Sequence, residues 1–242
     1  MRTGLFITGT DTGVGKSVVT AGLTLALKKR GLNVGFMKPV SAGCPVLDGE
    51  VVSTDVRFLR DVTGVRDDPD LVSPYRLKAA AAPSIASRLE DAHVDLSYIV
   101  DHYFQLTLLH EITIVEGVGG LMVPLNGNEL VSDLVLQLGL ELVIVARPGL
   151  GTINHTLMTV HTAKMMGIPV AGIIINGFGK DKIGLPERTS PDEIEHFCNT
   201  PVLGILPWMK DVDVERCHAG SLLNEFLERI NIEPLLPEEN EL

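Results

Sequence analysis

The sequence predicts an α/β fold in which a doubly wound, mainly parallel sheet is flanked by helices. Short runs of aliphatic residues alternate along the chain with longer segments of helical pattern. These runs are apolar almost throughout, which is typical of parallel strands that helices cover on both faces. A glycine-rich turn separates the first run from the first helical segment. Together these observations indicate repeated strand–helix–strand units with a ligand site at one edge of the sheet.

Six apolar runs are the predicted strands: Leu5–Thr8, Val34–Val40, Ile112–Val115, Leu142–Ala146, Val170–Ile175 and Val202–Leu206. Seven segments between and after them are predicted helices: Lys16–Lys29, Val52–Val62, Leu96–Leu109, Asp133–Leu138, Asn154–Met166, Pro191–Cys198 and Ser221–Ile230. The first helix is the best delimited, because Lys28, Lys29 and Arg30 place positive charge at its negative end. Gly31 then permits the left-handed conformation that ends a helix.

No linker or shift in composition divides the chain, so we expect one domain over residues 1–242. The stretch Asp67–His93 is the least regular, because Pro69, Pro74 and Pro83 interrupt its pattern, and it is interpreted as a long excursion near a site. The tail Pro234–Leu242 contains two prolines and three glutamates and is expected to be frayed.

The composition restricts the class of partner. With 20 basic and 31 acidic residues among 242, the net charge is −11, which disfavours a nucleic acid or an anionic membrane as a partner of the surface as a whole. Three widely spaced cysteines indicate reduced thiols of a cytoplasmic protein. The first residues do not resemble a secretory signal, and the apolar stretch Met165–Gly179 contains a proline, an asparagine and four glycines, so no membrane span is expected.

A phosphate-binding loop is predicted between the first strand and the first helix, in Gly9–Ser17 (GTDTGVGKS). Glycines at a helix N-terminus let several backbone N–H groups point at one anion, which the helix dipole also attracts. Lys16 supplies a positive charge for the β- and γ-phosphates, and Ser17 a hydroxyl ligand for Mg²⁺. The strict pattern GxxxxGK[ST] is not met, because its first glycine would fall on Thr10. The predicted nucleotide-binding residues are Gly13, Val14, Gly15, Lys16, Ser17 and Val18.

Mg²⁺ prefers oxygen ligands, and two carboxylates are candidates. Glu116 directly follows the apolar run Ile112–Val115, and the carboxyl ends of parallel strands meet at one edge of the sheet. Asp55 has two interpretations, a metal ligand or a charge that stabilises a helix N-terminus. Lys38 ends the second apolar run, where a lysine is favoured if its ammonium meets an anion.

Four segments together resemble one family. GTDTGVGKS, KPVSAG, VEGVGG and LGTINHT, followed by IIIN and LGILPW, are similar to the dethiobiotin synthetases over roughly Leu5 to Trp208. The resemblance implies a fold of the P-loop NTPase type and a ligase that depends on ATP and Mg²⁺. Such a ligase closes the ureido ring of dethiobiotin from 7,8-diaminopelargonic acid and CO₂, through a carbamate and a carbamic–phosphoric anhydride.

The resemblance also implies roles for individual residues. It implies that Lys38, Lys16 and Thr12 are catalytic residues and that Ser17, Asp55 and Glu116 bind Mg²⁺. It also implies that the nucleotide base is bound by Asn176, Gly204, Leu206 and Pro207. The expected substrate contacts are Ser41, Gly117, Val118 and Gly119, with Gly151, Thr152, Ile153 and Asn154 receiving the distal carboxylate in a site that a second subunit completes. A homodimer is therefore implied.

Three positions depart from the family's pattern. The family commonly has glutamate at Gly13, serine or threonine at Ala42, and histidine at Ser84. Ser41 precedes Ala42 and faces the opposite side of an extended chain, which places the substrate contact in question rather than the phosphate loop.

Two other functions are weighed against this one. Partition and cell-division ATPases, which act as ATP-driven switches, share a similar loop but carry a lysine where Asp11 stands. Cobyrinate-type amidotransferases need a further glutamine-hydrolysing domain, for which no room remains after Trp208. Trp208 itself is interpreted as a core or rim aromatic, and His110, His155 and His161 as structural or exposed, since no carboxylate or cysteine lies at metal-ligand spacing from them.

Overall fold

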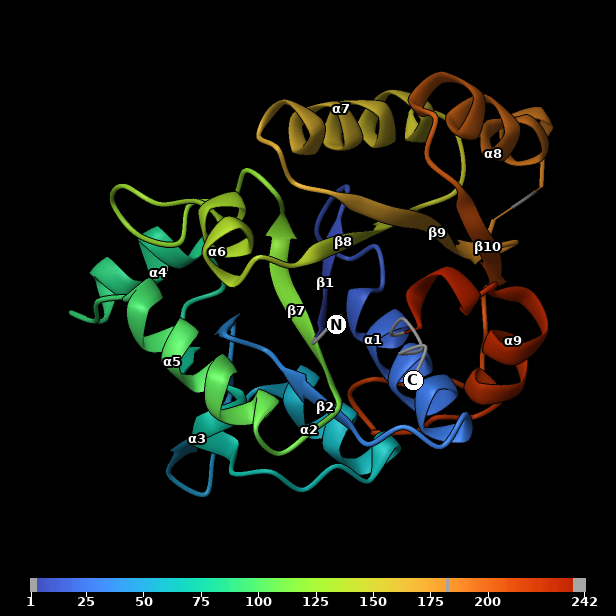
Figure 1. Cartoon of the computed structure of the whole chain (residues 1–242). Coiled ribbons are helices and arrows are strands. Elements are labelled where there is room, and N and C mark those ends of the chain that lie inside the picture. Colours follow the sequence, from blue (N-terminus) through green and yellow to red (C-terminus); the bar gives the residue numbers. More distant parts are fainter. Residues whose placement is uncertain (1–3, 182, 237–242) are drawn as a thin grey trace, which may run out of the picture.

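A parallel sheet of six strands forms the centre of the computed structural model, which describes residues 4–181 and 183–236 (Figure 1). The strands lie in the order β10–β9–β8–β1–β7–β2, and every neighbouring pair is parallel. Their bounds are β1 Gly4–Gly9, β2 Val34–Met37, β7 Ile112–Gly120, β8 Glu141–Ala146, β9 Val170–Phe178 and β10 Val202–Pro207. The predicted fold class is confirmed.

The middle of the sheet is the core of the molecule. All six residues of β1 are buried, and Ile7 pairs with Glu116 of β7 on one side and Val143 of β8 on the other. Strands buried on both faces need the continuous apolar sequence on which their prediction rested. The carboxyl ends of all six strands meet at one edge, which is where the phosphate loop leaves β1.

Helices cover both faces of this sheet. Packing between elements groups α1 (Lys16–Lys29) with α2 (Thr54–Thr63) and α9 (Leu222–Arg229) on one face. The other face carries α5 (Leu96–Thr107), α6 (Val131–Leu138), α7 (Thr152–Met165) and α8 (Leu185–Cys198). Figure 1 shows α7 and α8 side by side above β8, β9 and β10.

The second predicted strand is wrong in its length. The sheet strand β2 ends at Met37, because Pro39 has no N–H to donate to a ladder and the amide of Lys38 donates to the carbonyl of Val72. The chain resumes as β3 (Val40–Ala42), which pairs with β6 (Tyr75–Leu77) in a separate two-stranded sheet. A short hairpin of β4 (Val46–Leu47) and β5 (Glu50–Val51) then leads to α2. Lys38 therefore lies in a break between two sheets.

The stretch 67–93 is more regular than expected. It contains α3 (Pro69–Val72), β6 and α4 (Pro83–Leu89), and a proline opens each of the two helices. Proline suits the first helical position, where no N–H partner is needed, so these prolines begin elements rather than interrupt them.

The predicted frayed tail, Pro234–Leu242, is ordered at its beginning. Glu233–Leu235 form a short 3-10 helix, η1, and the side chain of Leu235 is completely buried, so Pro234 and Leu235 are not frayed. Burying an apolar side chain stabilises the segment against fraying. The remainder of the predicted tail, residues 237–242, lies outside the described residues.

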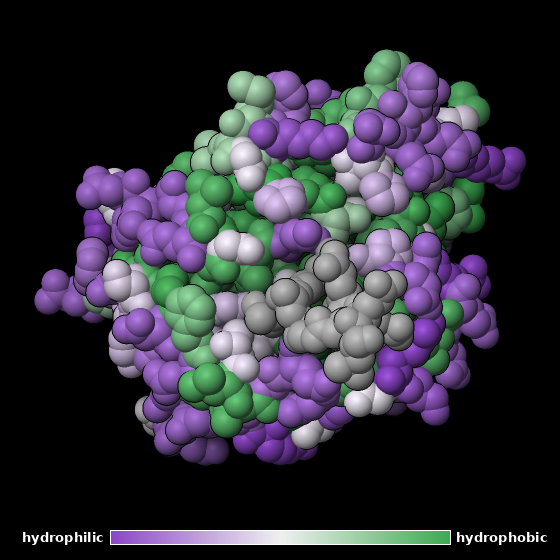
Figure 2. All heavy atoms as spheres, in the orientation of Figure 1, coloured by the Kyte–Doolittle hydropathy of each residue, from purple (hydrophilic) through white to green (hydrophobic). Residues whose placement is uncertain are grey.

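The face of the molecule seen in Figure 2 is largely polar. Figure 2 shows a mostly hydrophilic rim, with hydrophobic residues exposed in the upper middle of this face, between α6 and α7. Cys44, Cys198 and Cys217 are all free thiols. Among the described residues, no helix combines the length and the hydrophobicity that crossing a membrane requires.

Candidate active site

The phosphate loop joins β1 to α1 at the carboxyl edge of the sheet. Gly13 and Gly15 adopt left-handed conformations, with φ of 76° and 92°. At Gly15 no other residue fits, because a Cβ there would lie 2.1 Å from Nδ2 of Asn176. Gly15 also begins α1 without a side-chain cap, so the first N–H groups of this 14-residue helix are free to bind an anion.

Lys16 is held close to the loop. Its side chain is buried, and Nζ donates to the carbonyl oxygen of Asp11 at 3.2 Å. Burial, and to a lesser degree the nearby charge of Lys38, lower the pKa of Lys16 from 10.5 to about 8. The ammonium of Lys16 is poorly solvated and donates to a neutral carbonyl. A phosphate bound beside it would therefore stabilise its charge strongly.

The structure brings Lys38 together with two carboxylates. Nζ of Lys38 lies 2.5 Å from Oε1 of Glu116 and 2.9 Å from Oδ2 of Asp55. Burial disfavours the charged ammonium, but Glu116 and Asp55 outweigh this effect and raise the pKa of Lys38. Burial alone would raise the pKa of Asp55, whereas Lys38 holds it below its usual value. Lys38 and Asp55 are therefore both ionised at neutral pH.

Ser17 completes this cluster. Its Oγ donates to Oε1 of Glu116 at 2.8 Å, and the carboxylate of Asp55 is an alternative acceptor for the same hydroxyl proton. The second carboxylate oxygen of Glu116, Oε2, is buried without a hydrogen-bond partner. An unpartnered buried carboxylate oxygen beside a hydroxyl and a second carboxylate forms the oxygen set that suits Mg²⁺. We call Ser17, Lys38, Asp55 and Glu116 the lysine–carboxylate cluster.

The cluster does not form a metal site by itself. Within the described part of the chain, no three His, Cys, Asp or Glu residues are arranged to hold an ion. A Mg²⁺ ion would therefore need Ser17, nucleotide oxygens and water besides the two carboxylates. Both interpretations of Asp55 agree with the geometry, because it lies in the first turn of α2 and in the cluster.

Glu116 lies within β7 and not after it, as the sequence had suggested. The strand continues through Gly117, Val118 and Gly119 to Gly120, where it pairs again with Gly9 of β1 after a shift in register. A Cβ on Gly117 would lie 2.7 Å from the ring of Phe6, and one on Gly119 would lie 3.5 Å from Oγ1 of Thr12. The glycines thus let β7 pass close to the phosphate loop, beside the exposed Thr12.

A cavity of about 360 Å³ opens on one side of the phosphate loop. Three segments line it: residues 9–12 of the loop, residues 120–123 after β7, and one face of α7. Met122 and Met158 give it an apolar wall and are 55% and 60% exposed. Nδ1 of His155, which also lines it, is buried without a partner. The sequence pointed to none of these three side chains as part of a site.

A second cavity, of about 290 Å³, opens on the other side of the loop. Gly13, Gly15, Val18, Asn176 and Pro207 line it, as expected of nucleotide-binding residues. Nδ2 of Asn176 donates to the carbonyl of Val14 at 2.9 Å, which leaves its Oδ1 free to accept a hydrogen bond. The outer wall is the segment 208–215, which includes Trp208.

Two of the expected base-binding residues do not reach this cavity. The side chain of Leu206 is completely buried, because it is on the core face of β10. A Cβ on Gly204 would lie 2.0 Å from the carbonyl oxygen of Arg229, so this glycine serves the contact with the end of α9. Trp208, which the sequence analysis had set aside, lies at the cavity instead, with Nζ of Lys180 4.3 Å from its ring centroid.

Ser41 is also not where a substrate contact would be. It is 3% exposed, and its Oγ lies 2.8 Å from Oγ of Ser53. The hydroxyl therefore faces the start of α2, and it borders neither of the two cavities beside the loop.

The loop before α7 presents backbone rather than side chains. Gly151 begins the helix with φ of 92° and without a side-chain cap, and of the first helical N–H groups that of Thr152 donates to the carbonyl of Gly149 at 3.2 Å. Thr152 is buried, and its Oγ1 donates to the carbonyl of Arg147 at 2.5 Å, so its hydroxyl is already used. Ile153 is partly buried and Asn154 is exposed. This geometry is able to bind an anion such as a carboxylate.

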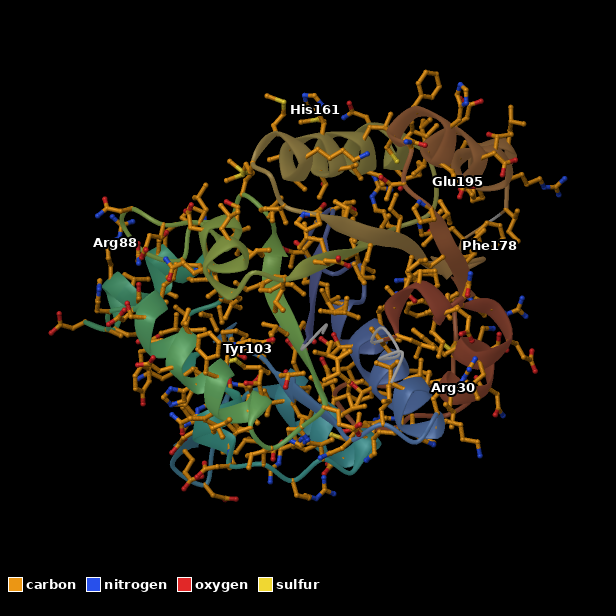
Figure 3. All side chains as sticks on the ribbon, viewed as in Figure 1. Arg30, Arg88, Tyr103, His161, Phe178 and Glu195 are labelled. Atoms are coloured by element: carbon orange, nitrogen blue, oxygen red, sulfur yellow. The ribbon has the colours of Figure 1, made fainter. Side chains whose placement is uncertain are left out.

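The other histidines have local explanations. The ring of His110 lies between Oδ1 of Asn33 at 2.9 Å and Oδ2 of Asp67 at 2.8 Å. His161 points away from the body on the outer side of α7 (Figure 3). Neither residue lies beside the phosphate loop.

Comparison with known proteins places these features in context. The family model described as "AAA domain" matches residues 3–216. The protein named ATP-dependent dethiobiotin synthetase of Bacillus licheniformis is 44% identical over 218 residues, which cover 89% of this chain and 90% of that protein. The protein of the same name from Thermodesulfovibrio yellowstonii is 39% identical over 237 residues, covering 95% and 99% of the two chains.

A solved structure is similar at the level of the fold alone. The MinD cell division protein of Aquifex aeolicus superposes with a TM-score of 0.62 at 15% identity, over the full length of both chains. This similarity confirms the P-loop NTPase architecture, whereas the relation to partition-type ATPases is distant. Since relatives at 39–44% identity match almost the whole chain, the chain belongs to the dethiobiotin synthetase family.

Proposed function

We propose that this protein is an ATP- and Mg²⁺-dependent ligase that forms dethiobiotin from 7,8-diaminopelargonic acid and CO₂. The observation that carries the proposal is that Lys16 lies close to the lysine–carboxylate cluster at a phosphate loop that two cavities border. Family membership supplies the reaction, and the two cavities accommodate its two larger substrates.

The first step needs two anions side by side. One amine of the substrate adds to CO₂ and loses a proton, which gives a carbamate. A carbamate oxygen then attacks the γ-phosphorus of ATP, ADP leaves, and a carbamic–phosphoric anhydride forms. Such a transfer depends on positioning and on neutralising charge, not on a general base. Lys16 neutralises the phosphates, and Lys38, buried between the loop and β7, lies where it can contact the carbamate and γ-phosphate together.

The backbone and the hydroxyls hold these groups in place. N–H groups of Gly117, Val118 and Gly119 bind the carbamate, and the hydroxyl of Thr12, close to Gly119, binds the carbamate or the γ-phosphate. Ser17, Asp55 and Glu116 would hold Mg²⁺, which would supply positive charge to offset that of the phosphates.

The second step closes the ring. The other amine attacks the carbonyl carbon of the anhydride, phosphate leaves with the C–O bond electrons, and the amine loses a proton. The cavity lined by the loop, residues 120–123 and α7 holds the diamine, whose methylene chain lies against Met122 and Met158. Excluding water here protects the anhydride from hydrolysis.

The second cavity receives the nucleotide base. Its residues Asn176, Pro207 and Trp208 lie beside Gly13 and Gly15, so the triphosphate reaches the loop without crossing the substrate cavity. The free Oδ1 of Asn176 accepts from the amino group of adenine.

We extend the proposal to the assembly. The loop Gly151–Asn154, in which the N–H of Thr152 already donates to the carbonyl of Gly149, offers its remaining N–H groups to the distal carboxylate of the substrate bound to a second subunit, so the protein acts as a homodimer. Leu150, at 83% exposed, together with Met122 and Met158 supplies apolar surface for that contact. The central sheet takes strands from Gly4 to Pro207, which supports our proposal of one domain for the chain. We also propose that the protein works in the cytoplasm.

Product formation tests this function. Purified protein with ATP, Mg²⁺, labelled bicarbonate and 7,8-diaminopelargonate should yield labelled dethiobiotin, with one ATP consumed per product. ATP consumption that is the same without the diamine, with no dethiobiotin, would contradict the proposal and favour a switch ATPase.

A further inference from the structure

Two serines form a buried hydrogen bond beneath the lysine–carboxylate cluster. Ser41 belongs to β3 and Ser53 begins α2, and their Oγ atoms are 2.8 Å apart. Both side chains are almost fully buried, at 3% and 4% exposure. Few protein hydrogen bonds join two side chains, and a buried one between two elements fixes where those elements sit relative to each other.

Ser53 transmits this constraint to Asp55. Its Oγ accepts from the amide of Val56 at 3.3 Å and so caps α2. Asp55 lies in the first turn of that helix, with Oδ2 2.9 Å from Nζ of Lys38. A shift of the helix start therefore moves the carboxylate of Asp55.

Ser41 transmits the same constraint to Lys38, from which it is separated by only Pro39 and Val40. Residues 38–41 and residues 53–55 are thus joined to each other by two side-chain contacts. The Lys38–Asp55 ion pair is one of them, and the Ser41–Ser53 hydrogen bond is the other.

We propose that Ser41 and Ser53 are positioning residues that hold Asp55 ready for Mg²⁺. Neither touches the substrate, and Ser41 acts on the reaction only through Ser53 and α2. This inference depends on the proposed role of Asp55 as a metal ligand. It assigns Ser41 to the metal side of the site instead of the substrate side, where the family resemblance had put it.

Substitutions of the two serines test the inference. Ser41→Ala is expected to raise the Mg²⁺ concentration for half-maximal turnover by about two- to tenfold, the range that one net hydrogen bond supports. The KM for the diamine should change less than twofold. A second readout, independent of turnover, is the Mg²⁺-dependent affinity for ADP in calorimetry, which should weaken by the same factor.

The pair also predicts how the variants combine. Ser53→Ala should shift the Mg²⁺ dependence as well, and the double variant should shift it by less than the product of the two, because both remove the same bond. Ser53→Thr keeps a hydroxyl and should therefore show the Mg²⁺ dependence of the wild type. Ser73→Ala is the matched control, since Ser73 is fully buried nearby and its Oγ has no hydrogen-bond partner. It should leave both constants unchanged.

The outcomes separate the two proposals. A diamine KM that rises tenfold in Ser41→Ala with an unchanged Mg²⁺ titration would overturn the inference and return Ser41 to the substrate. Asp55→Asn is measured alongside. If it shifts the Mg²⁺ dependence and Ser41→Ala does not, the positioning inference fails alone. If Asp55→Asn itself has no effect, the metal role of Asp55 fails first.

Discussion

Replacing Lys38 by methionine removes the cation between the buried carboxylate of Glu116 and the half-buried one of Asp55, while nearly preserving the volume of the side chain. Lys38 is 4% exposed and Glu116 is completely buried, so water cannot replace the lost charge. Breaking a buried ion pair in this way costs about 3–5 kcal/mol. For a chain of this size each kcal/mol lowers Tm by about 2–4 °C. The expected loss in Tm is therefore roughly 6–20 °C in the absence of Mg²⁺.

Mg²⁺ should return part of that stability. With ADP present, the ion neutralises the carboxylates that Lys38 neutralised, so it should raise the Tm of Lys38→Met by more than that of the wild type. Turnover should fall by at least about a hundredfold even at saturating Mg²⁺, because no other cation contacts both reacting anions. Nucleotide affinity should stay within a few-fold, since Lys16 and the loop are intact.

Calorimetry gives Tm, and Trp208, the single tryptophan of the chain, reports nucleotide binding through its fluorescence at the second cavity. Lys29→Met, at an exposed position of α1, controls for the loss of one positive charge. A Lys38→Met variant with unchanged Tm and no response to Mg²⁺ would refute the role of Lys38 in offsetting the carboxylates. A loss of nucleotide binding as large as the loss of turnover would instead make Lys38 a nucleotide ligand.

Further predictions concern the loop, the metal and the cavity wall. The pKa of Lys16 is about 8 when folded against 10.5 when unfolded, so the folded chain holds fewer protons between these values. Burial of Lys16 therefore lowers the free energy of unfolding, with its full effect below pH 8. This effect disappears as the pH rises from about 8 to 10.5. A triphosphate should reprotonate Lys16, so nucleotide binding at pH 9 should take up protons in calorimetry with buffers of different ionisation enthalpy. Lys16→Met should abolish this uptake, and equal uptake in both proteins would assign it to another group. Glu116→Ala should raise the Mg²⁺ requirement of turnover at least about tenfold, as expected for a charged ligand, whereas an unchanged titration would remove it from the metal site. Arg57 of α2 donates to the carbonyl of Glu215 at 2.6 Å and so holds the outer wall of the second cavity. Arg57→Ala should raise the KM for ATP about threefold to tenfold with little change in kcat. Arg88→Ala, at an exposed position of α4 that does not line this cavity, should change neither, and an equal effect of both variants would count against the wall contact.

The sequence predicted most of the sheet because burial on both faces demands it. Leu5–Thr8 and Leu142–Ala146 had to be apolar throughout, and both lie in strands of the central sheet. Strand ends were harder, because functional residues replace apolar ones there. Glu116 and the glycines after it break the apolar run although β7 continues to Gly120.

The candidate site was predictable where spacing along the chain determines the geometry. Lys16, Ser17 and the glycines of the loop follow one another, and Glu116 was brought to them by parallel topology alone. Contacts across the fold had no such signal. Nothing local shows that Ser41 bonds Ser53 across a hairpin, or that Trp208 borders a cavity that residues 212–215 close.

Side-chain direction along β10 separates the three residues that were predicted to bind the base. Gly204, Leu206 and Pro207 are near neighbours in sequence, but successive residues of β10 point to opposite faces of the sheet. Leu206 therefore belongs to the core, and only Pro207, at the end of the strand, reaches the nucleotide cavity.

The transfer of an oxygen atom tests the central claim most directly. If a carbamate formed from CO₂ attacks the γ-phosphate, one of its oxygens must leave with phosphate when the ring closes. Turnover with bicarbonate labelled with oxygen-18, ATP and the diamine should therefore give inorganic phosphate that carries one labelled oxygen for each dethiobiotin, as measured by mass spectrometry. Phosphate without label, formed at the same rate as dethiobiotin, would contradict the carbamate–phosphate route that Lys16, Lys38 and the cluster around them are proposed to serve.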